Sequence, residues 1–336
     1  MDALTGFACR DPRSAGAPDV HALFNRWQRA FPLVPRPFDA LGAECGWTGA
    51  QVIAALRAGR TRGEISRVGA AFGVGAGGAG LLCAMRVPAD RLDEVAECAS
   101  AEPGVNHNYA REHEWNLWFV ATAADYTQLH ACVDRIERLT GLAALRLPMR
   151  RAYRIDLGFD LFDVPGSRAD VQTAEPVRPG LRALAARLED GLALVERPFA
   201  ALGEPLGLDE AAVLHVLGQW CERGTVRRLG LVLRHHEFGI SANAMTVFAV
   251  AEPEVDAAGE RLAAQPGVTL CYRRESAHQW PYTLYCMVHG RERGAVRLTV
   301  DRVTQAAGLA HCRREVLFST RRFKQTGSHY FSRAAS

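Results

Sequence analysis

The sequence predicts an α+β protein, a tandem duplication in which each copy is a winged helix-turn-helix domain followed by a ferredoxin-like (βαββαβ) domain. One observation is a repeated decamer: LVPRPFDALG at residues 33–42 returns as LVERPFAALG at residues 194–203, with eight of ten residues identical. The other is that the hydrophobic period changes from helical to strand-like in the same order after each decamer. One repeat near half the chain length indicates two copies of a domain pair, because solenoid repeats recur every ~20–50 residues.

The composition indicates a globular protein of more than one domain. The 336 residues are 48% hydrophobic and 23% charged, and a domain typically takes ~100–200 residues. No apolar run is long enough to span a membrane, and residues 1–20 lack the features of a secretory signal, so we expect a cytoplasmic protein without membrane contact. A net charge of +3 argues against general nucleic-acid binding. The nine Cys are scattered without a C-x-x-C pair, so we expect no metal site.

Each copy begins with three short helices and a wing strand. We expect residues 1–19 to be disordered and residues 20–74 to form the first winged helix-turn-helix domain. Pro37 suits a first helical turn, and Thr48 caps a helix with Val52, Ile53 and Leu56 on one face. The expected helices are 20–31, 37–42 and 48–59, and the wing is 64–72. The second copy, residues 179–240, has helices at 181–189, 198–203 and 209–222 and a wing at 225–233.

The rest of each copy has the order βαββαβ, in which two helices cover one face of a four-stranded antiparallel sheet. The first ferredoxin-like domain is expected over residues 79–160, with strands at 81–87, 105–111, 115–121 and 142–155 and helices at 89–101 and 125–139. The second is expected over residues 242–331, with strands at 243–251, 268–274, 282–289 and 309–319 and helices at 254–264 and 291–307. Residues 161–178 are rich in Pro, Gly and polar residues, which is typical of a linker.

This domain order resembles the leucine-responsive transcription regulators, which bind DNA through the helix-turn-helix and small effectors through the sheet domain. The two recognition helices here, TGAQVIAALRAG and DEAAVLHVLGQW, present almost no ladder of Arg, Asn or Gln side chains to read base edges. Asp209 and Glu210 would repel a phosphate backbone. We therefore expect no nucleic acid as a partner and keep an effector-binding regulator only as an alternative function.

Five longer stretches are similar to the sirohaem decarboxylase family: VNHNYAREHEWNLWF, RRAYRIDLGFDL, VRRLGLVLRHHEFGISANAM, CYRRESAHQWPYTLYCMVHG and LFSTRRFKQTGSHYF. The resemblance covers nearly the whole chain from about residue 20 and implies a fusion of two homologous subunits. It implies sirohaem as substrate, with loss of the C12 and C18 acetate carboxyls to give 12,18-didecarboxysirohaem on the route to haem d1. It also implies that no cofactor is required, and that homologous decarboxylase subunits and further copies of this chain are partners.

The chemistry of such a substrate specifies the residues that a site needs. A flat apolar ring with a rim of carboxylates requires an apolar slot lined by Arg, His and Tyr. Loss of CO2 leaves an electron pair on the methylene, and His or Tyr suits the delivery of a proton there. Without catalysis, the same residues would bind an iron tetrapyrrole, with His235 or His289 on the iron. This carrier function is a second alternative.

The second copy holds the densest group of His, Arg and aromatic residues. The resemblance makes His235 the leading proton donor and Tyr272 a further catalytic candidate. Strand alternation places Tyr272 and Arg274 on one face and Arg273 on the other. The substrate-binding candidates here are Arg227, Arg228, Arg234, Arg273, Arg274, His278, Trp280, Tyr282 and His289. Taken singly, a strand aromatic is more often a core residue and an Arg on a wing is usually solvated.

The first copy matches this group in part. His107, Tyr109, Arg111 and His113 stand where the second copy has Leu270, Tyr272, Arg274 and Ser276. We take His107 and His113 as further catalytic candidates, and Tyr109, Arg111 and Lys324 as further substrate-binding candidates. Gly73 and Val74 replace the Arg234–His235 pair, and Arg154 stands where the resemblance leads us to expect His. The sequence therefore leaves open which copy supplies the acid.

Overall fold

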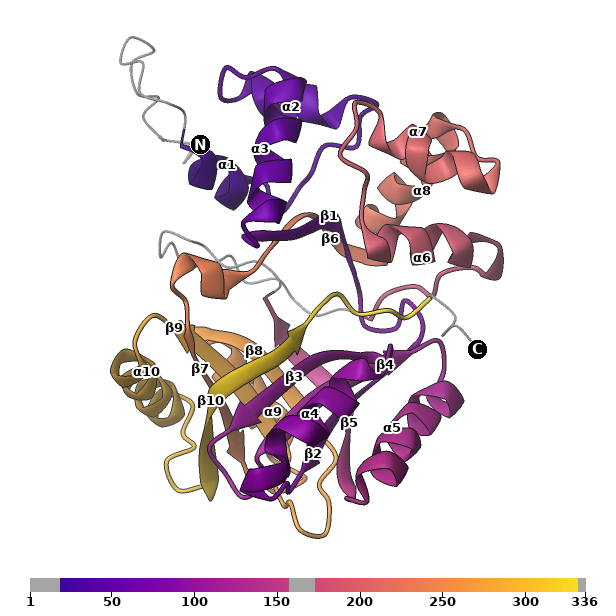
Figure 1. Ribbon diagram of the computed structural model, residues 1–336. Helices are drawn as coiled ribbons and strands as arrows, with labels where there is room; N and C mark the ends of the chain where they lie inside the picture. Colours follow the sequence, from indigo (N-terminus) through magenta and orange to yellow (C-terminus); the bar gives the residue numbers. More distant parts are fainter. Residues whose placement is uncertain (1–18, 157–172, 332–336) are drawn as a thin grey trace.

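A computed structural model of the chain describes residues 19–156 and 173–331 (Figure 1). It consists of two layers, with the helix-turn-helix domains on one side and a β-barrel on the other. The tandem α+β architecture that the sequence predicts is confirmed. The expected disorder of residues 1–19 and most of the expected linker, 161–178, lie outside the described residues. In the described part of that linker Ala174 and Val177 are buried and bond to the loop at 74–76, so this part packs against the protein.

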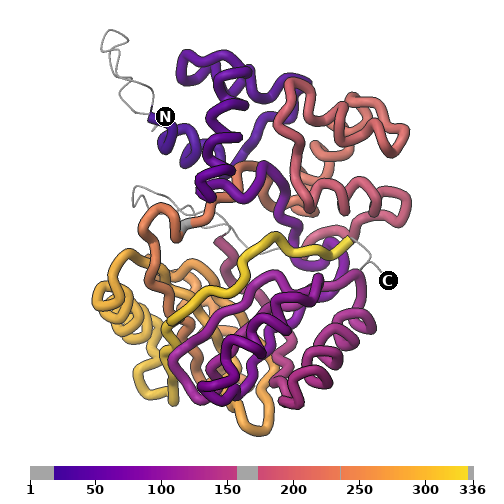
Figure 2. The backbone as a smooth tube through the Cα atoms, viewed as in Figure 1, coloured from indigo at the N-terminus to yellow at the C-terminus, as the bar shows by residue number. Residues whose placement is uncertain are grey.

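The two ferredoxin-like sheets join into one closed barrel. Its strands are β2 (Ala79–Met85), β3 (Val105–Arg111), β4 (Leu117–Ala123), β5 (Ala144–Ile155), β7 (Ala242–Phe248), β8 (Val268–Arg274), β9 (Leu284–Gly290) and β10 (Arg314–Gln325). All neighbours are antiparallel in the order β10-β3-β4-β2-β5-β8-β9-β7. The seams β10–β3 and β5–β8 therefore join the two copies, and Figure 2 shows the yellow β10 segment along the purple first copy. Closure leaves the barrel without an edge strand.

Helices cover the outside of the barrel. They are α4 (Leu92–Ala101) and α5 (Tyr126–Thr140) on the first copy, and α9 (Val255–Ala263) and α10 (Arg293–Ala306) on the second, with the short η1 (Ala89–Arg91) before α4. Their apolar faces pack on alternate residues of the strands, such as Leu81 and Cys83 of β2. The residues between them, such as Leu82 and Ala84, face the barrel interior. A strand buried on both faces accounts for the almost continuous apolar run in β2.

The two winged helix-turn-helix domains pack against each other. The first has α1 (Val20–Arg26), α2 (Pro37–Ala43), α3 (Gly49–Thr61) and the wing β1 (Ile65–Phe72). The second has η2 (Pro179–Leu181), α6 (Arg182–Asp190), α7 (Pro198–Gly203), η3 (Glu204–Leu206), α8 (Glu210–Glu222) and the wing β6 (Val226–Leu233), followed by η4 (His235–Phe238). The wings pair with each other as an antiparallel two-stranded sheet. Each repeated decamer places Pro at the start of a helix, α2 or α7, and Arg36 of the first decamer pairs with Glu196 of the second at 3.0 Å.

Leu147 of β5 lies in the barrel interior, where its side chain is 0% exposed. We expect Leu147→Ala to lower the free energy of unfolding by ~2–5 kcal/mol, because a closed interior cannot collapse around the lost side chain. Urea unfolding followed by circular dichroism measures this. Leu139→Ala, at a leucine with 68% exposure, is the control and is expected to change it by less than ~0.5 kcal/mol. Equal effects of the two changes would contradict the packed interior.

Candidate functional site

One end of the barrel faces the paired wings, and we name this end the mouth (Figure 1). Strands β3 and β8 begin there and occupy equivalent positions in the two copies. Each carries a Tyr and an Arg toward the interior: Tyr109 and Arg111 on β3, and Tyr272 and Arg274 on β8. The guanidinium carbon lies 5.8 Å from the centre of the Tyr109 ring in the first pair and 5.3 Å from that of Tyr272 in the second. The predicted pairing of Tyr272 with Arg274 is thus present in both copies.

The two barrel arginines make equivalent bonds. Arg111 Nη1 donates to the carbonyl oxygen of Leu317 at 2.9 Å, and Arg274 Nη1 donates to that of Leu147 at 2.9 Å. Arg111 Nη1 also donates to Asn243 Oδ1 at 3.2 Å. In the described part of the chain neither guanidinium pairs with a carboxylate, and both Nε atoms are buried without a partner. These charges are therefore fixed in place by neutral groups.

The wings add two more guanidiniums from equivalent positions, Arg67 of β1 and Arg228 of β6. Arg67 Nη2 donates to the carbonyl oxygen of Ala70 at 3.5 Å, and Arg228 Nη2 to that of Leu231 at 3.4 Å. Both Nε atoms are again buried without a partner. Arg67 approaches residue 327 so closely that a Cβ atom on Gly327 would lie 2.6 Å from its Nη1. Arg67 thus reaches from the wing to the segment after β10, which crosses the mouth.

We name Arg67, Arg111, Arg228 and Arg274 the arginine cluster. Burial lowers the pKa of all four guanidiniums, to about 10 at Arg111 and about 9 at Arg228. Arg67 also lowers the pKa of Arg228, whereas Glu189 and Asp190 act on Arg67 in the opposite direction without an ion pair within 4 Å. Positive charge held in a low dielectric without a paired anion is unfavourable. The arrangement is therefore complementary to an anion with several carboxylates.

His107 stands beside this cluster. Asn106 Nδ2 donates to Thr122 Oγ1 at 3.0 Å, which turns Asn106 Oδ1 toward His107 Nδ1, 2.6 Å away. With that amide orientation Nδ1 carries the hydrogen, and Nε2 is left to accept or deliver a proton. Burial and the neighbouring Arg67 lower the pKa of His107 to about 4. His107 is half-buried, and its ring is stacked toward Tyr109 at 6.3 Å between centres.

The two tyrosines of the mouth are neutral hydrogen-bond donors. Burial raises the pKa of Tyr109 and of Tyr272, and the adjacent arginines only partly oppose this effect. Both rings keep some accessible surface. A phenol that stays protonated at neutral pH donates to a carboxylate without adding negative charge. Tyr272 therefore lies beside Arg274 on one strand face, as strand alternation predicts.

The other end of the barrel is filled with aromatic side chains from the loops after β3 and β8. Trp280 Nε1 donates to Tyr285 Oη at 2.6 Å, and the Trp280 ring lies 4.7 Å from Tyr282 and 5.3 Å from His113. Trp280 and Tyr282 are 1% and 2% exposed, whereas His278 in the same loop is exposed. Trp280 is linked to the arginine cluster through Tyr285, whose ring lies 5.8 Å from the Arg274 guanidinium carbon. No side-chain contact of His113, His278 or Tyr282 with the cluster is among those that the structure gives. The aromatic side chains close this end of the barrel.

Two candidates lie on the outside of the barrel. Arg273 pairs with Asp256 of α9 at 3.1 Å, as strand alternation predicts. Lys324 Nζ donates to the carbonyl oxygens of Ser100 and Glu102 at 2.7 and 3.2 Å, at the end of α4. A cation stabilises the negative end of a helix. Lys324 therefore lies near the mouth end of β10, but its side chain is on the outer face of the barrel.

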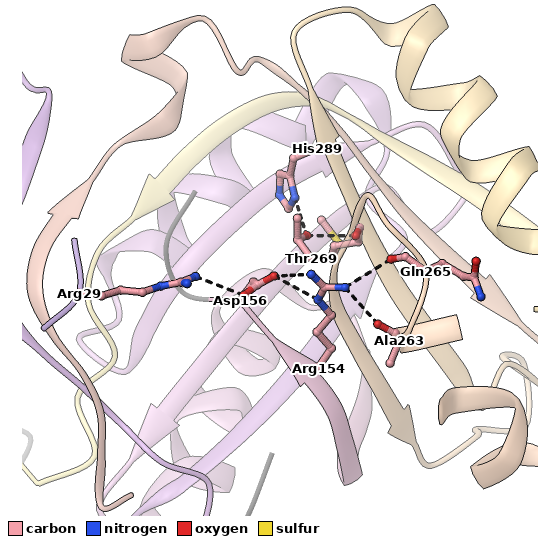
Figure 3. A network of polar contacts seen from close by, with 8 residues as sticks. Arg29, Arg154, Asp156, Ala263, Gln265, Thr269 and His289 are labelled. Atoms are coloured by element: carbon pink, nitrogen blue, oxygen red, sulfur yellow. Dashed lines mark hydrogen bonds and ion pairs between the residues drawn. The ribbon is translucent and has the colours of Figure 1, made fainter. Parts of the chain in front are cut away.

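Arg154 is the counterpart of Lys324 in the other copy, and Figure 3 shows its contacts. Its Nη1 donates to the carbonyl oxygens of Ala263 and Gln265 at the end of α9, at 3.1 and 3.3 Å. Its Nη2 bonds to Asp156 Oδ2 at 2.8 Å, and Asp156 also pairs with Arg29 of the first helix-turn-helix domain at 3.3 Å. The Arg at position 154 thus joins a helix end, the barrel and the upper layer.

His289 of β9 is another predicted site residue that Figure 3 shows, where it contacts Thr269 of β8. Its Nδ1 lies 2.8 Å from Thr269 Oγ1, and Thr269 Oγ1 donates to the carbonyl oxygen of Met287 at 3.0 Å (Figure 3). His289 sits on β9 at the mouth end, so it lies on the same side of the barrel as the arginine cluster. Its ring is held by the Thr269 hydroxyl.

The remaining candidates lie at the second wing. Arg227 lines a cleft of about 570 Å³ together with Arg228, Arg29 and Asp156. Arg234 follows β6, where its N–H donates to the carbonyl oxygen of Glu64 at 2.9 Å. His235 begins η4, and its side chain lies outside the part that the structure describes. No contact between the Arg234 side chain and the barrel is among those that the structure gives.

Sequence reasoning missed two residues of the mouth, Arg67 and Tyr330. Arg67 stands alone in SRVGAAF, but it occupies the position of Arg228 in the repeat, and this equivalence was the available signal. Tyr330 lies in one of the stretches that are similar to the sirohaem decarboxylase family. Its place at the mouth follows only from the pairing of β10 with β3 and from the hydrogen bond of its N–H to Glu189 of α6.

The described residues contain no group of three His, Cys, Asp or Glu side chains arranged to hold a metal ion. No helix in residues 19–156 and 173–331 is long and apolar enough to cross a membrane.

Comparisons with known proteins agree with this architecture. The model of the siroheme decarboxylase NirDL-like HTH domain matches residues 21–65 and 182–227, and that of the AsnC-like ligand binding domain matches residues 75–154 and 237–324. The siroheme decarboxylase NirDL subunit of Paracoccus denitrificans (strain Pd 1222) is 43% identical over 91% of this chain and 95% of that protein. The NirL subunit of Stutzerimonas stutzeri is 46% identical over 43% of this chain and 85% of that protein.

A solved structure supports the same assignment. The crystal structure of the siroheme decarboxylase NirDL with an iron-uroporphyrin III analogue has a TM-score of 0.66 and 26% identity, over 94% of this chain and 95% of that chain. The half-length NirL subunit and the full-length NirDL subunit both match, as a fusion of two homologous subunits requires. The chain therefore belongs to the siroheme decarboxylase family, a family of carboxy-lyases, and has its fused NirDL form.

Proposed function

We propose that this chain removes the C12 and C18 acetate carboxyls of sirohaem at the mouth of the barrel and releases 12,18-didecarboxysirohaem for haem d1 biosynthesis. The observation that carries the proposal is the arginine cluster, in which two buried and two half-buried guanidiniums, from the wings and from the barrel strands, bond to neutral groups among the described residues. A polycarboxylate supplies the missing negative charge, so its binding offsets the unfavourable burial of these cations. The relative that binds an iron-uroporphyrin III analogue has the same fold.

The reaction also limits where the arginines bind the substrate. A guanidinium on a carboxylate stabilises it in the ground state and opposes loss of CO2, so the cluster serves best on carboxylates that do not react. The reacting acetate then points to the apolar interior, where Met245 and Val247 of β7 lie beside Tyr285 of β9. An apolar environment favours the step from an anion to neutral CO2.

The step needs a proton and no change of oxidation state. The bond between the methylene and the carboxylate breaks, its electron pair stays on the methylene, and one proton completes a methyl group beside the released CO2. In the described part of the mouth His107 is our choice of donor, because its Nε2 is available and bound carboxylates raise its pKa. His235 remains a proposed donor from the resemblance. Because the reaction balances in this way, we propose that the protein supplies no cofactor and no metal of its own.

We also propose that homologous decarboxylase subunits and further copies of this chain are its protein partners. The two copies within this chain already form the pairing that separate homologous subunits would form between chains. Association with other decarboxylase subunits or with further copies of this chain stays a prediction.

The proposed activity is tested by anaerobic incubation of the purified chain with sirohaem, followed by mass spectrometry. A product lighter by two CO2 units supports the proposal. Unchanged mass with a shifted Soret band would instead indicate a tetrapyrrole carrier. Retention of a promoter fragment at moderate salt, without any change of the tetrapyrrole, would indicate a regulator.

We expect Arg274→Met to weaken binding of iron-uroporphyrin III by ~10–100-fold, the equivalent of a charge-assisted hydrogen bond. Since the change also removes a buried cation without a paired anion, we expect the melting temperature to stay the same or rise. Titration followed by the Soret band and thermal unfolding measure the two effects. Arg138→Met, at an exposed Arg of α5, is the matched control and should change neither. Unaltered affinity in Arg274→Met would remove this residue from the site.

His107→Gln is expected to lower turnover ~100–10,000-fold and to leave binding of sirohaem nearly unchanged, because the amide keeps polarity but delivers no proton. Single-turnover kinetics and equilibrium titration separate the two effects. His235→Gln is measured in parallel, and His215→Gln, at an exposed His of α8, is the control. If His107→Gln lost binding and turnover equally, His107 would be a binding residue; if His235→Gln alone lost turnover, His235 would be the donor.

Binding should also change the protonation of His107. The free protein keeps the imidazole neutral above its pKa of about 4, against an ordinary value of 6.5. Carboxylates at the mouth raise that pKa, so between pH 4 and 6.5 the wild type is expected to take up as much as one proton more than His107→Gln on binding iron-uroporphyrin III. Calorimetry in buffers of different ionisation enthalpy measures this uptake. The same uptake in both proteins would contradict the placement of His107.

A further inference from the structure

The segment after β10, residues 326–331, lies between the barrel and the upper layer, and we name it the C-terminal strap (Figure 1). At its start the N–H of Thr326 donates to the carbonyl oxygen of Asn106 at 2.8 Å. The N–H of His329 donates to Thr122 Oγ1 at 3.2 Å. Asn106 and Thr122 are the residues that orient His107. The strap is thus attached to the structure that holds the proposed proton donor.

The far end of the strap is held by one buried carboxylate. Glu189, the penultimate residue of α6, is 2% exposed and accepts the N–H groups of Tyr330 at 2.5 Å and of Phe331 at 3.1 Å. The Phe331 ring lies 4.7 Å from Phe72 of the wing, and a Cβ atom on Gly77 would lie 2.5 Å from it. These contacts fix the backbone on both sides of the Tyr330 side chain.

Tyr330 is directed into the barrel. A Cβ atom on Gly78 would lie 2.7 Å from Tyr330 Cβ, and one on Gly80 would lie 3.8 Å from its hydroxyl oxygen. Gly80 belongs to β2, where Leu82 and Ala84, two and four residues further on, face the interior. Strand alternation gives Gly80 the same face. The Tyr330 hydroxyl therefore lies inside the mouth, in van der Waals reach of the interior face of position 80.

The two copies differ at the residue beside the barrel arginine, which is Asn243 for Arg111 and Gly80 for Arg274. Arg111 pairs with Ser319 across the β10–β3 seam, and Asn243 bonds to Ser319 from the next strand and accepts from Arg111. In the other copy Arg274 pairs with Met149 across the β5–β8 seam, and the next strand brings Gly80 to the position equivalent to Asn243. Glycine offers no group to Arg274.

We infer that Tyr330 is a substrate-contacting residue that replaces the missing amide at the second half of the mouth, and that Glu189 is the positioning residue that holds it there. The Tyr330 hydroxyl donates a hydrogen bond to the same carboxylate that Arg274 binds. This inference rests on the proposed binding of a tetrapyrrole polycarboxylate at the mouth. Burial raises the pKa of Tyr330, and a hydrogen bond with the Ser328 side chain and, less strongly, the nearby Arg274 oppose that rise, which agrees with a neutral hydroxyl near this guanidinium.

The test uses the full chain with iron-uroporphyrin III as the probe. Tyr330→Phe keeps the ring and removes the hydroxyl, so we expect its Kd to rise ~10–100-fold with an unchanged melting temperature. Glu189→Gln, which weakens the bonds to the strap, should raise the Kd in the same direction. Because both act through one contact, the double variant should bind no more weakly than Tyr330→Phe alone. Tyr126→Phe, at a tyrosine with 63% exposure, is the matched control.

The outcomes are distinct from those that test the proposed function. Wild-type chain that binds no iron-uroporphyrin III would overturn the proposed mouth site itself. If the wild type binds and Tyr330→Phe binds equally well, Tyr330 has no contact with the ligand. If the effects of Glu189→Gln and Tyr330→Phe add fully in the double variant, Glu189 does not act through Tyr330. A release of residues 326–331 to limited proteolysis in Glu189→Gln, but not in Tyr330→Phe, would support the positioning role.

Discussion

The burial of guanidinium groups without paired carboxylates among the described residues is the constraint on which the rest of this structure depends. Four arginines come from two wings and two barrel strands, and backbone carbonyls or an amide hold each of them. Such an arrangement costs free energy in the empty protein, since neutral acceptors do not neutralise a buried charge. It persists only in a scaffold rigid enough to prevent the side chains from turning out to solvent. The closed barrel and the paired wings provide that rigidity.

Duplication explains how one chain builds this scaffold. A four-stranded ferredoxin-like sheet has two edges and one face that its own helices leave uncovered. The two copies join at both edges and enclose both uncovered faces, so the edges and the apolar surface disappear together. The pairing of the wings does the same in the upper layer. Equivalent residues of the two copies therefore face each other around one opening.

The order of the helices and strands and the faces of the strands could be predicted from the sequence, because local patterns determine them. The change of hydrophobic period gave the order of the elements, and strand alternation separated Arg273 from Tyr272 and Arg274. The closed barrel could not be predicted in this way, since it depends on pairing between strands more than a hundred residues apart. For the same reason the sequence could not show that Trp280 is buried inside the barrel, where Tyr285 links it to Arg274. Lys324 lies in a stretch that is similar to the sirohaem decarboxylase family, but its side chain bonds to the C-terminal end of α4. Only the packing of α4 against β10 reveals this role.

The two halves of the mouth are not identical, and the covalent fusion gives this difference a meaning. In an assembly of two identical chains every substitution appears twice, so Gly80 would have to coexist with another glycine opposite it. In a single chain the halves can differ: one has an amide at position 243, and the other has a glycine at position 80 beside a tyrosine from the C-terminal strap. A ligand that contacts both halves would thus meet two differently equipped walls, which two identical chains could not provide.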